Sequence, residues 1–172
     1  LLSTNKFVHS VLVQETETME SEVRVLPETF TPNILIIIIL ILIMELDKAI
    51  QNRHSVRKFS NKKPNWRTII ECIDSARYAP MAGNNYTLKF ILVDKEDKIN
   101  KISEACQQQF IVQAKYVVVV CSNPSRTVNA YGKKGEIFCR QQAGAAIQNF
   151  LLKIEEARLS TCWVGYFIEE QI

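Results

Sequence analysis

The apolar residues between positions 44 and 172 repeat with helical spacing in several stretches. Leu46, Ala49 and Ile50 lie at positions i, i+3 and i+4, which predicts a short amphipathic helix. Asn65 is a typical N-cap residue for a second helix over 66–78. The apolar face of that second helix would comprise Trp66, Ile69, Ile70, Ile73 and Ala76. Two more helices are predicted, over Glu96–Cys106 with Ile99, Ile102 and Cys106 inward, and over Glu136–Arg158.

Three stretches have the composition of β-strands. Leu88–Val93 is one, and Tyr116–Cys121 is too apolar for a strand with one solvated face, so we expect it to be buried on both faces. Thr161–Gly165 is a further strand candidate. The Pro-x-x-Gly-Asn-Asn sequence predicts a loop over Ala79–Asn85, and Ser122–Gly135 is also predicted to be loop. Together these elements predict an α+β domain in which long helices cover a sheet.

Residues 1–43 differ from the rest of the chain. They are polar and acidic before an unbroken apolar run, Ile34–Met44. Those 11 residues make about 16 Å of helix, whereas a membrane span needs roughly 20 residues, so a span is disfavoured. The chain begins with Leu1, and the amphipathic pattern starts at Met44. We therefore hypothesise that the first 43 residues are an extension outside the domain, either translated upstream sequence or a short hydrophobic anchor, and that the domain spans 44–172.

The bulk composition narrows the class of protein. With 47% apolar and 23% charged residues, the chain is expected to be globular. The five cysteines form no C-x-x-C pair and match no zinc spacing, which favours reduced structural thiols, a cytoplasmic location and no metal site. Residues 1–43 hold two basic and five acidic side chains, so residues 44–172 carry a net charge of +6. That excess would suit a phosphorylated ligand, nucleic acid or a membrane surface.

The segment Arg53–Phe59 holds the densest set of candidate binding groups. Its sequence is Arg-His-Ser-Val-Arg-Lys-Phe. Arg53 and Arg57, with Ser55 between them, can hold a phosphate dianion through charge-assisted hydrogen bonds and leave one guanidinium for a second acidic edge. The alternative interpretation of such a run is a solvated basic face.

Two further motifs follow this segment in order. They are Ala-Pro-Met-Ala-Gly-Asn-Asn at 79–85 and Leu-Ser-Thr-Cys-Trp-Val-Gly-Tyr-Phe at 159–167. Together with Arg53–Phe59, these motifs resemble those of the nitroreductase family of FMN-dependent flavoproteins, and the resemblance covers 44–172. It implies an α+β fold with a central, mostly antiparallel sheet flanked by helices, and with the long helix at a homodimer interface.

The resemblance assigns roles to the basic segment. It implies that Arg53, His54 and Ser55 bind the phosphate and ribityl end of FMN. Arg57 would face the N1/C2 edge of the isoalloxazine, where reduction develops negative charge that a cation stabilises. We therefore expect Arg57 to tune the redox potential of the flavin, the alternative being an ordinary surface ion pair.

The resemblance also assigns roles to the two later motifs. Asn84 would reach FMN from the partner subunit, so that each site is built across a homodimer interface. The backbone of Val164, Gly165 and Tyr166 would lie along one face of the flavin and present an N–H to N5. Gly165 would permit the close approach of the ring, because it has no Cβ.

The chain also departs from the family pattern. Met81 replaces a serine, and Tyr86 and Thr87 replace a Gln-Pro pair, which changes a hydroxyl contact and the shape of the loop. Gln142 stands where an aspartate is common on the long helix. Arg158 and Ser160 stand where glycines are common. The family continues beyond a segment like Phe167–Ile172 with a strand, a basic phosphate contact and an arm around the partner, so we expect a C-terminally truncated domain that binds FMN weakly.

The function implied by the resemblance is a ping-pong transfer of electrons from NAD(P)H to nitroaromatic, quinone or similar acceptors. The flavin would perform the chemistry, so no catalytic acid or nucleophile is expected in the protein. Related flavin chemistry, such as dehalogenation or flavin breakdown, is an alternative within the same family. A basic nucleic-acid-binding module would account for the charge, and a membrane-anchored interaction protein would use Ile34–Met44.

Overall fold

The computed structural model describes residues 7–15 and 46–171 as four strands, five α-helices and four 3-10 turns. The strands are β1 (Phe7–Glu15), β2 (Leu88–Val93), β3 (Tyr116–Ser122) and β4 (Leu159–Val164). The helices are α2 (Leu46–Asn52), α3 (Trp66–Asp74), α4 (Glu96–Cys106), α5 (Ser125–Tyr131) and α6 (Lys134–Glu156). The 3-10 turns are η1 (Ser75–Tyr78), η2 (Ala82–Asn84), η3 (Gln109–Gln113) and η4 (Glu169–Gln171).

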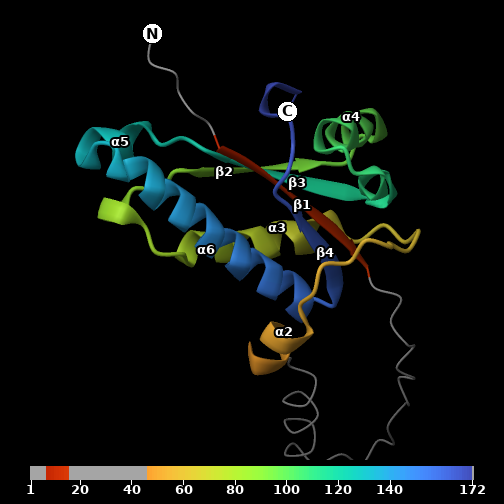
Figure 1. The fold of residues 1–172 in the computed structure, drawn as a ribbon. Helices are drawn as coiled ribbons and strands as arrows, with labels where there is room; N and C mark the ends of the chain where they lie inside the picture. Colours follow the sequence, from red (N-terminus) through yellow and green to blue (C-terminus); the bar gives the residue numbers. More distant parts are fainter. Residues whose placement is uncertain (1–6, 16–45, 172) are drawn as a thin grey trace, which may run out of the picture.

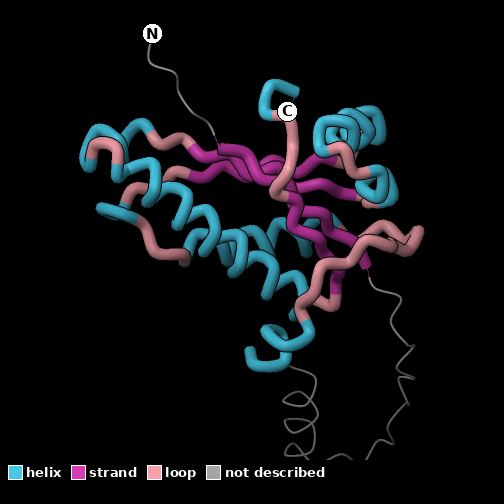
Figure 2. Tube along the Cα trace, viewed as in Figure 1, coloured by secondary structure: helices cyan, strands magenta, loops and turns pink. Residues whose placement is uncertain are grey.

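The strands form one antiparallel sheet in the order β2-β3-β1-β4. Helices α3 and α6 pack on one face of this sheet, and α4 with η3 packs on the other (Figure 1). Figure 2 shows the same three layers, with the long α6 crossing beneath the strands. The predicted α+β class with a mostly antiparallel sheet flanked by helices is therefore confirmed.

Strand β3 separates two hydrophobic cores. Val118 and Val120 face the core beneath α6, whereas Val117 and Val119 face the core beneath α4. All four of these side chains are buried, as the predicted burial of both faces requires. Phe150 of α6 is fully buried in the first core, and its ring makes an edge-to-face contact with Phe90 at 6.4 Å between centroids.

The sequence analysis placed residues 1–43 outside the domain, but the structure includes Phe7–Glu15 in the sheet. These nine residues form β1, which pairs with β3 on one side and with β4 on the other. Val11 and Val13 contribute to the core beneath α6, and Leu12 contributes to the core beneath α4, each with 0% exposure. This part of the assumed extension thus belongs to the sheet. The predictions for 16–43, including the Ile/Leu run, lie outside the described residues.

Most of the other predicted elements agree with the structure, and two differ. Strand β2 and helix α4 have the predicted bounds, and Asn65 caps α3 by accepting a hydrogen bond from Arg67 N at 3.0 Å. The predicted loop Ser122–Gly135 was wrong, because it contains the short helix α5. The predicted apolar face of the second helix is confirmed in part: Ile69 of α3 and Ala76 of η1 are buried, and Ile73 packs against the same core. Trp66 and Ile70 are exposed instead, and Cys72 is buried.

Three observations bear on membrane spans, metal sites and disulfide bonds. Among residues 7–15 and 46–171, no helix combines the length and apolar character needed to cross a bilayer. The same residues contain no cluster of three or more His, Cys, Asp or Glu side chains with the geometry of a metal site. None of the five cysteines forms a disulfide bond.

Cys72 should make the stability of the fold fall at high pH. Burial raises the pKa of its thiol from 9.0 to about 11; the nearby Lys153 lowers this pKa, and the carboxylates of Glu156 and Glu71 raise it further. Between those two values the unfolded chain has lost the thiol proton and the folded chain retains it, so the free energy of unfolding should decrease as pH rises. Urea unfolding across this range should show a steeper decrease for the wild type than for Cys72→Ala. Equal slopes would contradict this assignment.

Candidate functional site

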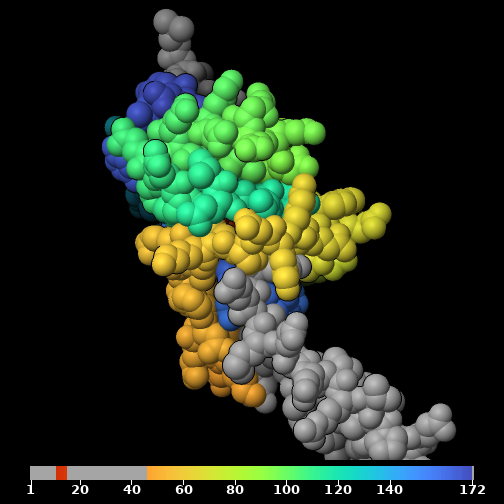
Figure 3. All heavy atoms as spheres, turned by 90° about the vertical axis from the view of Figure 1, so that its right-hand side faces the viewer, coloured from red at the N-terminus to blue at the C-terminus, as the bar shows by residue number. Residues whose placement is uncertain are grey.

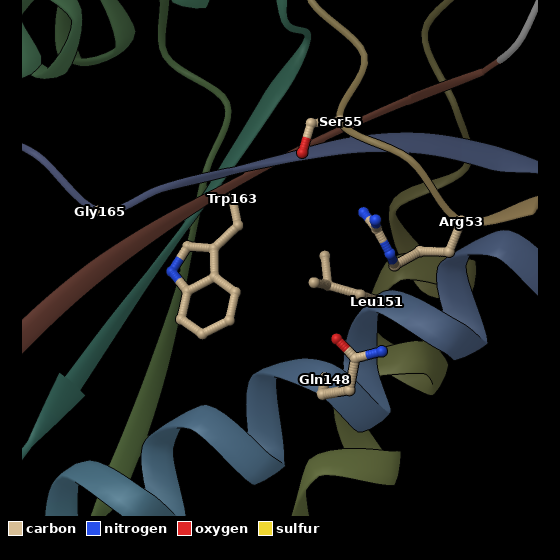
Figure 4. A pocket seen from close by; sticks show the side chains of 6 residues that line it. All are labelled: Arg53, Ser55, Gln148, Leu151, Trp163 and Gly165. Carbon is tan, nitrogen blue, oxygen red and sulfur yellow. The ribbon is translucent and has the colours of Figure 1, made fainter. Parts of the chain in front are cut away.

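A cavity of about 600 Å³ lies between β4, α6 and the segment that follows α2. Its lining residues are Arg53, Ser55, Gln148, Leu151, Trp163 and Gly165. Figure 4 shows that the Trp163 indole projects from β4 toward Gln148 of α6, and that the Arg53 guanidinium points into the space beside them. This volume is within the range of pockets that hold cofactors.

The basic segment is held against the edge of β4 that faces away from β1. Helix α2 ends where Arg53 N donates to Ala49 O at 3.0 Å, and the chain then becomes extended. Val56 N donates to Thr161 O at 2.9 Å, and Ser55 pairs with Thr161 in a parallel bridge. The side chains of Arg53 and Ser55 are thereby placed beside the strand that carries Trp163 and Gly165.

A buried glutamine of β1 holds the continuation of the same segment. Gln14 has 0% exposure, and its side-chain amide donates to the carbonyl oxygens of Ser60 and of Lys62. Its Oε1 atom accepts a hydrogen bond from Lys115 N at 2.9 Å, at the start of β3. In Figure 3 the orange and yellow residues that follow α2 cross this side of the molecule below the green and teal residues of the α4 layer.

His54 and Arg57 lie in the basic segment but do not line the cavity. The His54 ring is exposed, and its Nδ1 atom lies 2.7 Å from Asn52 O. Arg57 is also exposed, and its guanidinium carbon lies 6.0 Å from the centroid of the Phe110 ring, on the α4 side of the sheet.

Cys162 lies directly behind the basic segment. Burial raises the pKa of its thiol, against the opposing effects of Arg57, a hydrogen bond with Ser55, and Arg53. A thiol with a raised pKa stays protonated near neutral pH and is a poor nucleophile. Cys162 therefore serves as packing behind the site, and nothing in its surroundings points to covalent chemistry.

The residues at the end of β4 divide between the two faces of the sheet. Trp163 and Gly165 line the cavity, whereas Val164 is buried in the core beneath α4. Apart from its chain neighbours, no atom of the described residues lies within 4 Å of the position where a Cβ on Gly165 would be, so a ligand has room to approach the backbone there. Tyr166 is 63% exposed and, with Val164, does not line the cavity.

Asn84 is on the exposed loop before β2 and does not line the cavity of its own chain. Its φ angle is +55°, next to Gly83 at +58°, so two consecutive residues adopt the left-handed conformation. Such a pair makes a sharp turn, which Gly and Asn tolerate better than other residues.

Three lining residues were not predicted as site residues from the sequence: Gln148, Leu151 and Trp163. Gln148 and Leu151 are three apart on α6 and so share one helix face, which could have suggested that they act together. Their sequence periodicity alone does not distinguish a cavity wall from the core or from solvent. In the sequence, Trp163 has the pattern of an ordinary core residue in a strand. Only its position opposite α6 in the structure places it in the cavity.

The lining has the two chemical characters that FMN requires. At one end a guanidinium and a hydroxyl, from Arg53 and Ser55, can donate charge-assisted hydrogen bonds to a phosphate. At the other end Trp163 and the open space over Gly165 can accommodate a planar aromatic ring. The residues present therefore fit a ligand that combines a phosphate with a flat ring system.

Comparison with known proteins identifies the family. A model described as the nitroreductase family matches residues 50–116 and 103–172. The chain belongs to the nitroreductase family.

A relative from Archaeoglobus fulgidus is 29% identical over 125 residues, which are 72% of this chain and 69% of the relative. One from Methanothermobacter thermautotrophicus is 28% identical over 131 residues, 75% of this chain and 65% of the relative. Both carry the provisional name NADH dehydrogenase/NAD(P)H nitroreductase, and the matched region spans about two thirds of their length.

Solved structures confirm that this family member has the nitroreductase fold. A nitroreductase family protein from Clostridium novyi superposes with a TM-score of 0.66 at 23% identity, covering 74% of this chain and 75% of that one. The NADPH:FMN oxidoreductase from Vibrio harveyi, solved with NAD⁺, has a TM-score of 0.57 at 18% identity, covering 65% and 52%.

Proposed function

We propose that this nitroreductase-family chain is an FMN-dependent oxidoreductase that takes electrons from NAD(P)H. The observation that carries the proposal is the cavity itself, in which Arg53 and Ser55 lie at one end and Trp163 and Gly165 at the other. Family membership and the names of the relatives support an oxidoreductase. When bound, FMN would supply two-electron chemistry between NAD(P)H and a nitroaromatic, quinone or similar acceptor.

The proposed roles combine the positions of the residues that line the cavity with the roles that the family resemblance implies. Arg53 and Ser55 would hold the phosphate, with His54 contributing at the same end. The backbone of Val164, Gly165 and Tyr166 would lie along the flavin ring. Trp163 and Leu151 would form the wall against the ring and exclude water, which strengthens the electrostatic effect of nearby cations.

We propose that the complete site is built across a homodimer. Asn84 is exposed and absent from the cavity of its own chain, as a residue that serves a partner's site would be. Large exposed apolar side chains on α2, on α6 and after β4 would be covered by the partner. These are Leu46, Ile50, Ile137 and Tyr166. We also place the protein in the cytoplasm, because none of its cysteines forms a disulfide bond.

The proposal is tested by adding FMN to the purified, flavin-free protein. We expect the visible absorbance of the flavin to shift on binding, and NADH or NADPH to be oxidised when a quinone or nitroaromatic acceptor is present. Titration would give the dissociation constant, and gel filtration the oligomeric state. A protein that takes up no FMN at concentrations near 1 mM would contradict the proposed function.

The Arg57 guanidinium lies near Phe110 and does not line the cavity, so its role in redox tuning rests on the family resemblance and requires the side chain to turn toward the flavin. With that turn, replacing Arg57 with alanine should lower the midpoint potential of bound FMN. A cation near the N1/C2 edge stabilises the reduced, negatively charged ring, so its removal favours the oxidised form. If the cation contributes about 1.4 kcal/mol, the shift is about 30 mV for a two-electron couple. Arg57→Lys is the matched control, because it retains the charge and should keep most of the potential. An unchanged potential in Arg57→Ala would remove this role.

A further inference from the structure

We propose that Gln142 of α6 is a positioning residue that, together with Thr87, fixes the loop Met81–Asn85 so that Asn84 is presented outward. The effect on FMN binding rests on the proposed function, whereas the effect on the loop does not. Gln142 is unusual among the residues of α6 because it is a polar side chain with only 4% exposure.

The contacts of Gln142 form a directional chain of hydrogen bonds. Ser122 Oγ, at the end of β3, donates to Thr87 Oγ1 at 3.2 Å. Thr87 Oγ1 donates in turn to Gln142 Oε1 at 2.6 Å. Gln142 Nε2 then donates to the carbonyl oxygen of Asn85, the last residue of the loop, at 3.4 Å. Because Asn85 O can only accept, the amide nitrogen of Gln142 faces it and Oε1 faces Thr87, which fixes the direction of the two hydroxyl bonds.

The backbone of the same residues is held to β3 as well. Asn123 N donates to Thr87 O at 2.8 Å. Since Thr87, Ser122 and Gln142 are all buried, losing one partner would leave a polar group without a hydrogen bond in the protein interior. The end of the loop is therefore anchored to α6 and to β3 by side chains that are largely shielded from water.

The first half of the loop is restricted by steric contact with Tyr131. A Cβ on Gly83 would lie 2.6 Å from the Tyr131 hydroxyl, so the aromatic ring of α5 closes tightly over this turn. Asn84 N and Asn85 N bond back to Met81 O and Ala82 O at 3.3 and 3.1 Å. With its start packed and its end hydrogen bonded, the loop holds Asn84 in the left-handed conformation.

Two departures from the family pattern meet in this network. Thr87 stands in place of a proline and Gln142 in place of an aspartate, and the structure bonds the two side chains to each other. An aspartate could accept from Thr87 but, when ionised, could not donate to Asn85 O. The amide supplies both functions at once. We infer that these two substitutions act as a pair that gives this chain its own means of fixing the Asn84 loop.

The loop itself is tested without flavin. Hydrogen–deuterium exchange of a peptide covering 81–87 should be faster in Gln142→Met than in the wild type, while exchange of β3 stays unchanged. Thr87→Val should reproduce the effect, and Thr87→Ser, which keeps the hydroxyl, should restore wild-type exchange. Asn149→Leu is the matched control, because Asn149 of α6 also donates a side-chain hydrogen bond to a carbonyl, Ser75 O at 3.4 Å, away from the loop.

The consequence for the site is tested with FMN. Gln142→Met should raise the dissociation constant about fivefold to tenfold, as expected for the loss of one hydrogen bond. In an Asn84→Ala background the same substitution should cause no further rise. Additive effects of the two substitutions, or unchanged loop exchange in both Gln142→Met and Thr87→Val, would overturn the inference. If the wild type takes up no FMN, the proposed function fails, while the exchange experiment still decides whether Gln142 positions the loop.

Discussion

Replacing Leu12 with alanine should lower the free energy of unfolding by about 2–5 kcal/mol. Leu12 lies in the middle of β1, has 0% exposure and packs in the core beneath α4 with Val117, Val119 and Cys162. The substitution removes apolar contacts and leaves a cavity between β1 and the α4 layer. The backbone of β1 is fixed by its ladders with β3 and β4, so the site has little freedom to collapse.

This measurement also decides the place of the N-terminal segment in the fold. If β1 lay outside the domain, Leu12→Ala would have no effect on stability. Val112→Ala serves as the control, because Val112 is 50% exposed and its loss should change stability by less than about 0.5 kcal/mol. Chemical denaturation followed by Trp fluorescence would report both variants. Equal midpoints for Leu12→Ala and the wild type would contradict the central position of β1.

Replacing Arg53 with alanine should raise the dissociation constant for FMN about 10-fold to 150-fold. Arg53 points into the cavity beside Ser55, and a hydrogen bond to a charged group contributes about 1.5–3 kcal/mol. The effect should fall with increasing salt, since part of it is electrostatic attraction for the phosphate. Arg53→Lys should be intermediate, because lysine retains the charge but loses the planar pair of donors.

The control for Arg53 is a cation elsewhere on the surface. Arg126 of α5 is exposed and does not line the cavity, so Arg126→Ala should leave the dissociation constant unchanged. Riboflavin, which lacks the phosphate, gives a second comparison: its binding should be nearly insensitive to Arg53→Ala. If Arg53→Ala bound FMN as the wild type does, the phosphate would have to be held elsewhere.

The elements that were predicted well are those whose signals are local. Helix α4 and strand β2 have the predicted bounds, because their apolar periods are clear and turn residues flank them. Helix α5 was predicted as loop, since seven residues are too few for a helix to be stable alone. It is held by packing on α6, where a Cβ on Gly135 would lie only 2.6 Å from Thr127 O.

The residues of the candidate site also divide into those that sequence motifs indicate and those that only the fold brings to the cavity. The ordered motifs around Arg53, Asn84 and Gly165 indicate the family, and the match to the family model confirms it. Of these residues, Arg53 and Gly165 lie in one cavity and Asn84 does not. Gln148 and Leu151 enter the cavity only because α6 passes beneath β4, a relation that no local pattern encodes.

By itself the sequence determined the fold class, the family and the cations offered to a ligand, because these depend on residue type and short-range spacing. The tertiary structure alone decided that Phe7–Glu15 is a central strand, since its partners β3 and β4 are more than a hundred residues away. It also decided that Thr87 and Gln142 form a bonded pair, because a hydrogen bond depends on the distance between atoms and not on separation along the chain.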